Sequence, residues 1–170
     1  MNQVFETVRN ILAVRQFETT PVSEDTLGRI VEAARLSASA MNKQPWQFIV
    51  VQDPDGLRRL GALARSGPYI AQAPVAVVVA VEGSKFAVSD ASRAIQSMML
   101  TAWAEGVGSN WVGFGGLDEV KELLGIPTEL DVLAVVPFGY PAKAVSDPHK
   151  KRKSLGEVVH QERYGVPFRG

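Results

Sequence analysis

The sequence predicts one domain in which helices cover both faces of a β-sheet. Pro74–Val81 is a continuous apolar run rich in valine, and such a run suits a central strand that is covered on both faces. Phe86–Glu105 gives the longest helical pattern, and its apolar residues lie around most of the helix circumference, so this helix must be buried. A chain of 170 residues is long enough for one such core, so we expect residues 1–170 to form a single domain.

Composition narrows the classes of partner and of chemistry. Lys plus Arg and Asp plus Glu both total 18, so no charge bias favours nucleic acid or a membrane surface as the partner. The chain has no cysteine, which excludes disulfides, thiolate nucleophiles, iron–sulfur clusters and cysteine zinc sites. Met1–Thr7 lacks a signal-peptide pattern, and Val75–Val81 is too short to span a bilayer. These observations predict a cytoplasmic protein.

Two helices are expected before the first strand. Asn2–Ala13 carries apolar residues at helical spacing and leads, through a polar turn, to Pro21. Asp25–Leu36 repeats the helical spacing, and Ser23 is placed as its N-cap.

The other elements follow from turn signals and apolar runs. We expect strands at Phe48–Val51, Pro74–Val81, Ser109–Val112 and Leu133–Phe138, and helices at Leu57–Arg65, Phe86–Glu105, Asp118–Leu124 and Leu155–His160. The long helix has more apolar surface than a small domain readily covers. It is therefore either sandwiched between two subunits or a central helix buried within the monomer.

The stretch Ser37–Phe48 is a loop between two well-patterned elements. Pro45 biases Gln44 toward extended backbone, so the chain leaves the helix before Pro45 and its peptide groups need other partners. Ser37, Ser39, Asn42 and Gln44 can supply those partners. The loop is either a structural connector whose Trp46 fills the core, or a functional loop.

Two further stretches invite a functional interpretation. His149–Lys153 is the basic cluster of the chain, either a solvated surface or an anion site. Gly106-x-Gly108 is not a dinucleotide fingerprint, because the third glycine is misplaced and no strand precedes it.

His149 and His160 have no metal-ligand spacing, so we treat both as surface residues and expect no metal site.

Markers that follow one another along nearly the whole chain together resemble one family. The most specific is Ser37-x-Ser39-x-x-Asn42-x-Gln44-Pro45-Trp46-x-Phe48. The others are Val8–Phe17 with its Arg15-x-Phe17 ending, Ala73-Pro74 before the valine strand, Asp90 and Gln96–Leu100 on the long helix, Gly106-x-Gly108-Ser109, and Gly139-Tyr140-Pro141 before the basic segment. This pattern resembles the FMN-dependent nitroreductase family.

The resemblance implies a fold, an assembly and a reaction. The fold is α+β, a mixed β-sheet flanked by helices, in an intertwined homodimer with a long central interface helix and two FMN sites between the subunits. The tail, from about 154 to 170, packs on the partner subunit. In the implied ping-pong reaction, NADH or NADPH gives hydride to FMN and leaves, and a small oxidant such as a nitroaromatic or quinone takes its place.

The resemblance also implies which residues bind the cofactor. No side chain is required as a catalytic acid or base, because the flavin performs the redox chemistry. The implied contacts are Arg15 near the N1 and O2 edge of the flavin; Ser66 near its pyrimidine edge; Trp111, Val112 and Gly113 against the ring, with a backbone N–H near N5; Lys151, Arg152 and Lys153 at the phosphate; and Ser39, Ala40, Met41 and Asn42 from the partner subunit.

One departure from the family pattern bears on FMN affinity. Ile11-Leu12-Ala13 stands where family members commonly have Arg-Arg-Ser, so an arginine and a hydroxyl expected at the phosphate are missing. Arg9 lies two residues earlier and would point elsewhere on a helix. Two alternatives therefore stand beside the reductase: a flavin-dependent dehydrogenase or dehalogenase of the same fold, and a flavin-binding protein without reductase turnover.

Overall fold

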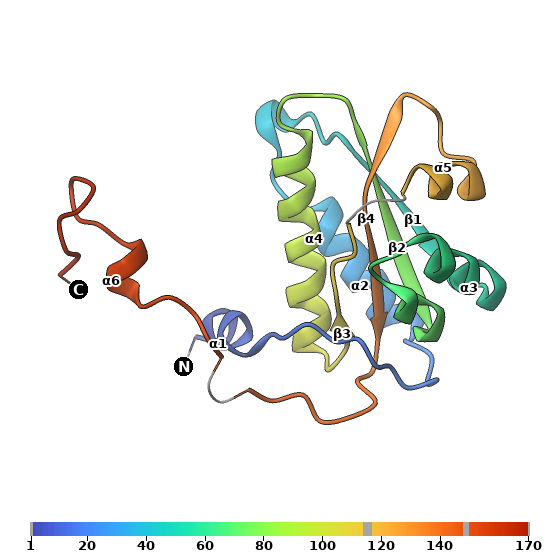
Figure 1. Ribbon diagram of the computed structural model, residues 1–170, viewed down its shortest axis with the longest axis horizontal. Helices are drawn as coiled ribbons and strands as arrows, with labels where there is room; N and C mark the ends of the chain where they lie inside the picture. The colour runs from blue at the N-terminus through green and yellow to red at the C-terminus, as the bar shows by residue number, and fades with distance from the viewer. Residues whose placement is uncertain (1, 114–116, 148–149, 170) are drawn as a thin grey trace.

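A four-stranded sheet forms the centre of the part of the chain that the computed structural model describes, residues 2–113, 117–147 and 150–169. Its order is β1 (Trp46–Val51), β2 (Val75–Glu82), β4 (Leu130–Gly139) and β3 (Gly108–Ser109). Neighbouring strands pair antiparallel. Figure 1 shows helices on both sides of this sheet, as the sequence predicts.

The burial of both faces of β2 confirms that the valine run is a central strand. Every residue from Val75 to Val81 is buried, and successive side chains alternate between the two faces of the sheet. Val75, Val77, Val79 and Val81 join the core beneath α2 (Glu24–Arg35) and α4 (Ala87–Ala104). Ala76, Val78 and Ala80 join the core beneath α3 (Pro54–Leu63), η2 (Pro68–Gln72) and α5 (Asp118–Leu124).

Residues 13–18, which we call the edge segment, extend the sheet beside β3. Ala13 forms a parallel bridge with Ser109, and the Val14 N–H donates to the Ser109 carbonyl at 2.9 Å. The Glu18 N–H donates to the Tyr140 carbonyl at 2.8 Å. The bridge from Ala13 is parallel, whereas the four strands of the sheet pair antiparallel throughout.

The edge segment explains why the first helix is shorter than predicted. α1 covers Gln3–Asn10, capped by the Asn2 side chain, and Ile11 already has extended backbone. The predicted end at Ala13 is wrong, because the backbone of Ala13 and Val14 pairs with β3 instead.

Other boundaries also differ from the prediction: β1 begins at Trp46, α3 covers Pro54–Leu63 and β4 covers Leu130–Gly139. β3 ends at Ser109, although Val112 bridges Val135 farther along, and α6 covers only Leu155–Val158. The Ser23 cap is confirmed, because its side chain accepts the Thr26 N–H at 3.2 Å.

Helix α4 buries one stripe within the single chain, including Ala91, Ile95, Met98 and Ala102. Val88 remains 56% exposed, and α1 has no buried residue, with Phe5 61% exposed. The apolar surface that the sequence shows on α4 is therefore only partly covered within one subunit, and the two-subunit interpretation stays a prediction. Within the described residues, none of the helices combines the length and the apolar character needed to cross a bilayer.

The carboxylate of Glu105 ties the end of α4 to α2, and this tie should make stability sensitive to acid. Arg29 contacts Glu105 with two nitrogens at 2.7 Å, and the Thr26 hydroxyl donates to the same carboxylate at 2.9 Å. The Arg29 hydrogen bond lowers the pKa of Glu105. A lowered pKa stabilises the fold above the ordinary pKa of a glutamate, and this stabilisation is lost as the pH falls through the lowered value.

We therefore expect Glu105→Gln to flatten the loss of stability in acid. Urea unfolding at neutral pH and at several acid pH values measures this, with the wild type losing stability more steeply than the variant. Parallel pH profiles would show that Glu105 does not couple folding to protonation.

Candidate functional site

Close packing against β3 fixes the position of the edge segment. A Cβ built on Gly108 would lie 2.4 Å from Cγ2 of Val14, so only glycine allows the two backbones to approach this closely. Val14 is buried and Arg15 is exposed, because successive side chains of an extended segment point to opposite sides. The predicted flavin contact Arg15 is thus held by a backbone that is anchored on both sides.

Residues 111–113 are anchored to the sheet and to the loop that holds Ser66. The Val112 N–H donates to the Val135 carbonyl at 3.0 Å, and the Val135 N–H returns the bond at 2.8 Å. A Cβ on Gly67 would lie 2.6 Å from Val112. Exposed Ser66 therefore lies next to a residue in direct contact with Val112.

Two side-chain contacts give this region its shape. The Asn110 amide donates to the Tyr69 hydroxyl, both in part-buried surroundings, and links the predicted ring-facing segment to η2. A Cβ on Gly113 would lie 2.5 Å from Nε1 of Trp111 and 3.1 Å from the Leu133 carbonyl oxygen. Glycine at 113 is therefore required for the indole of Trp111 to lie where it does.

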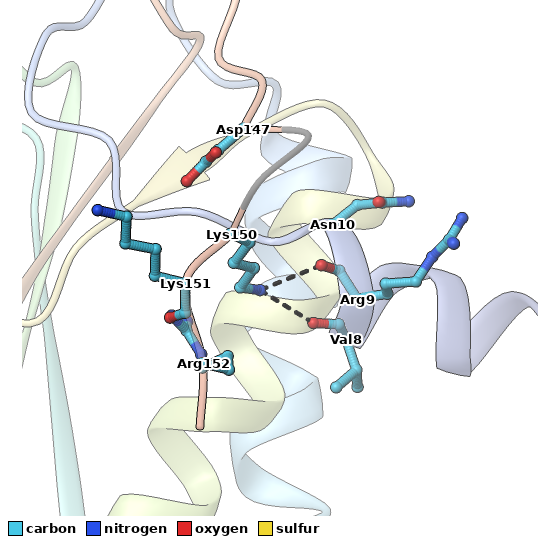
Figure 2. Close-up of a pocket in the computed structure, with 7 residues that line it drawn as sticks. All are labelled: Val8, Arg9, Asn10, Asp147, Lys150, Lys151 and Arg152. Atoms are coloured by element: carbon cyan, nitrogen blue, oxygen red, sulfur yellow. Dashed lines mark hydrogen bonds between the residues drawn. The ribbon is translucent and has the colours of Figure 1, made fainter. Parts of the chain in front are cut away.

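A basic groove of about 880 Å³ lies between the end of α1 and the residues after β4 (Figure 2). Its lining consists of Val8, Arg9, Asn10, Asp147, Lys150, Lys151 and Arg152. The structure thus brings together two of the three predicted phosphate cations, Lys151 and Arg152, and both are exposed. Lys153 does not line the groove, and His149 lies outside the described residues.

Lys150 was not among the predicted site residues, yet it joins the groove to the edge segment. Its ammonium donates to the carbonyls of Val8 at 3.3 Å, Arg9 at 3.2 Å and Ile11 at 2.8 Å. These carbonyls belong to the last turn of α1 and to its C-cap residue, Ile11, where helix bonds are missing and cations are favoured. Burial lowers the pKa of Lys150, and the charge of Arg152 lowers it further. The signal in the sequence that could have identified Lys150 was the basic run, considered together with the predicted C-terminal end of the first helix.

Replacing Lys150 with methionine keeps the aliphatic stem and removes these three bonds. We expect Lys150→Met to destabilise the fold by about 1 kcal/mol, because charge-assisted bonds to helix carbonyls are lost. The melting temperature should fall by about 2–4 °C, as measured by circular dichroism. Lys153→Met, which lies outside the groove, is the matched control, and equal melting temperatures for the two variants would contradict the contact.

Arg9 does not replace the family arginine that is missing at Ile11. Its guanidinium pairs with Glu6 at 2.7 Å, and Figure 2 shows it pointing away from Lys151 and Arg152. The contribution of Ile11 to the groove is its carbonyl, which holds Lys150.

The four remaining predicted contacts, Ser39, Ala40, Met41 and Asn42, lie at the other end of α4. The Ala40 N–H donates to Asp90 near the start of α4 at 3.1 Å, whereas β3 follows the end of that helix (Figure 1). Asp90 and Ala104 are separated by about 21 Å along the helix at 1.5 Å per residue. The structure does not bring these four residues to the basic groove of their own chain.

The donor set of the groove suits an anion. Lys151 and Arg152 offer charged donors, and no group of three or more potential metal ligands occurs in the described ranges. A phosphate group matches this donor set better than a metal ion does.

Comparison with known proteins identifies the family to which the sequence is similar. The sequence matches the nitroreductase family over residues 12–71 and 65–140. It is 33% identical over 174 residues to a protein of Archaeoglobus fulgidus with the provisional name NADH dehydrogenase/NAD(P)H nitroreductase, covering 96% of this chain and 100% of that protein. FMN reductase [NAD(P)H] of Bacillus subtilis is 28% identical over 189 residues, covering 96% and 75%.

A solved structure agrees with the fold. The crystal structure of a protein from Parabacteroides distasonis, which has the same provisional name as the Archaeoglobus protein, superposes with a TM-score of 0.89 at 25% identity. The match covers 96% of this chain and 100% of that one.

Proposed function

Because the chain belongs to the nitroreductase family, we propose that it is an FMN-dependent oxidoreductase that uses NADH or NADPH to reduce nitroaromatics, quinones or similar small oxidants. The observation that carries this proposal is the convergence of three features. The basic groove, the edge segment with Arg15, and residues 111–113 are joined by the contacts of Lys150 with Ile11 and of Ala13 with Ser109. The names of the relatives, among them an FMN reductase, support it.

The residues present fit FMN by their chemistry. Lys151 and Arg152 would hold the phosphate through charge-assisted bonds, and Arg15 would place a positive charge near the pyrimidine edge of the ring, which favours the reduced, anionic form. Trp111, Val112 and Gly113 would form the wall against the ring. FMN, when bound, accepts hydride and passes it on, so the protein has to orient the ring and leave room for donor and oxidant in turn.

We also propose a homodimer in which each site receives Ser39–Asn42 from the partner subunit. The distance along α4 between this loop and the basic groove supports it, because a single chain cannot complete the site. Exposed apolar residues also support it: Val4 is 69% exposed and Tyr164 is 92% exposed. The tail from about 154 to 170 would pack on the partner; its described part, residues 154–169, extends away from the sheet and its helices in Figure 1.

The proposed place of action is the cytoplasm, where NADH and NADPH are available as donors. Since the described residues include no long inserted segment over the groove, we propose small planar oxidants rather than one dedicated substrate.

A direct experiment uses purified protein that has been loaded with FMN and desalted. We expect it to be yellow, to lose its visible flavin absorption when NADH or NADPH is added without oxygen, and to recover it when a nitroaromatic or quinone is added. Protein that stays colourless after incubation with FMN would overturn the proposal.

The second candidate, a flavin-binding protein without reductase turnover, is favoured by the apolar Ile11 where an arginine is expected. It predicts that FMN binds but is not bleached by either nicotinamide donor. The same experiment therefore separates the two candidates.

A further inference from the structure

The loop that contains η1 (Ala40–Asn42) has a backbone that ordinary side chains rarely adopt. Met41, Asn42 and Gln44 have φ of 51°, 55° and 50°, in the left-handed region that favours glycine. A loop with three such residues keeps its shape only when the surroundings fix it. The residues that fix it must therefore be sought in the elements it touches.

Asp90 on α4 is the buried group that meets this loop. Its side chain is 1% exposed. One oxygen, Oδ2, accepts the Ala40 N–H at 3.1 Å, and the other, Oδ1, accepts a bond from the Arg93 guanidinium. Both oxygens are thus engaged by donors, and the carboxylate is shielded from solvent. Asp90 therefore cannot reach a substrate as a proton donor, but it can hold the loop.

Two other hydrogen bonds hold the flanks of the loop. The Ser37 hydroxyl donates to the Ser97 hydroxyl at 2.8 Å, and the Gln44 N–H donates to the Ser39 hydroxyl at 2.9 Å. Neither bond reaches from the core to residues 40–42. Among the contacts described, the Asp90 bond is the one that ties the start of η1 to the body of the protein.

We propose that Asp90 is a positioning residue for the flavin site of the partner subunit. By accepting the Ala40 N–H, it holds Ser39–Asn42, with the left-handed backbone of Met41 and Asn42, in the shape in which the loop meets FMN across the subunit interface. This inference rests on the proposed function, because the loop has a ligand to meet only if FMN binds between two chains.

The chemistry of the contact makes Asp90→Asn a sharp test. Both partners of Asp90 are donors, and an asparagine of the same shape offers only one acceptor oxygen together with an NH2 donor group. Whichever way the amide turns, either Ala40 or Arg93 faces a donor. The variant therefore removes one bond without opening a cavity.

The experiment compares FMN-loaded and FMN-free wild type, Asp90→Asn and Ser97→Ala. Ser97→Ala is the matched control, because it removes a hydrogen bond between the same helix and the same loop but outside residues 39–42. FMN affinity is measured by quenching of flavin fluorescence. Loop order is measured by trypsin cleavage after Lys43, an exposed residue next to Asn42.

For Asp90→Asn we expect the FMN dissociation constant to rise about tenfold, since a buried charge-assisted bond is lost, and cleavage after Lys43 to be faster even without FMN. Ser97→Ala should change both by less than about twofold, because that part-buried bond joins two neutral hydroxyls and involves no charge. If Asp90→Asn does not fold, Ala40→Pro removes the same N–H at the first helical position, where proline is tolerated, and should weaken FMN binding equally.

The outcomes separate the inference from the proposed function. A wild type that takes up no FMN overturns the proposed function and the flavin role of Asp90 together. A wild type that binds FMN, with Asp90→Asn of unchanged affinity, overturns the positioning role alone, whether or not cleavage after Lys43 is faster.

Discussion

The double substitution Lys151→Met and Arg152→Met should raise the dissociation constant of FMN by about 100-fold or more while leaving that of riboflavin nearly unchanged. Each lost charge-assisted bond to a phosphate costs about 1.5–3 kcal/mol, and every 1.4 kcal/mol is about tenfold in affinity. Both side chains line the basic groove. Riboflavin carries the same ring without the phosphate, so it does not use these cations. Parallel fluorescence titrations of the two flavins measure the difference.

Lys153→Met is the matched control for this double variant. It removes the same kind of charge from the same basic run but outside the groove, so its FMN affinity should stay within a few fold of the wild type. If the double variant instead lost affinity for FMN and riboflavin to the same extent, the two cations would act through the fold rather than on the phosphate.

The layered fold was accessible from the sequence because its strongest signals are local. The valine run of β2 required burial on both faces, and the structure places both faces under helices. The bounds of α5, Asp118–Leu124, were also predicted. In each case the signals that predict the element are local: the apolar spacing lies within the helix or strand, and the turn residues lie directly beside it.

What the sequence alone could not provide are contacts between distant segments. Ala13 was predicted as the last residue of the first helix, but it forms a bridge with Ser109, which is distant in the sequence. The loop with the left-handed Met41 and Asn42 is joined through the Ala40 N–H to a carboxylate on another helix, Asp90. The residue types in these two segments do not predict the observed backbone conformations, because the contacts involved join segments that are distant in the sequence.

The candidate site was predicted in its parts but not in its arrangement. The basic run was visible in the sequence, but the sequence could not indicate which of its lysines binds the carbonyls at the end of α1. The structure shows that this residue is Lys150. The placement of residues 39–42 at the far end of α4 became evident only in three dimensions. The assignment of roles among adjacent cations depends on where α1 ends, which the sequence pattern placed three residues too late.

Among the glycines that the structure describes, Gly108→Ala should be the most disruptive exchange for alanine. The new Cβ would lie 2.4 Å from Cγ2 and 2.7 Å from Cβ of Val14, and a β-branched side chain next to its own backbone has little freedom to move away. Relief requires the edge segment to leave β3, which breaks the Val14 bond to Ser109. We expect a loss of about 2–3 kcal/mol in the free energy of unfolding, measured by urea denaturation. FMN affinity should fall as well, because Arg15 moves with Val14.

Gly28→Ala makes the same chemical change on α2, where a Cβ meets nothing within 4 Å. Alanine is a better helix former than glycine, so this control should gain about 0.5–1 kcal/mol. Adding Val14→Ala to Gly108→Ala removes the two γ-carbons but leaves Cβ in place. If the clash is the cause, the double variant should recover part of the loss, whereas additive destabilisation would place the effect of Gly108 elsewhere than in its contact with Val14.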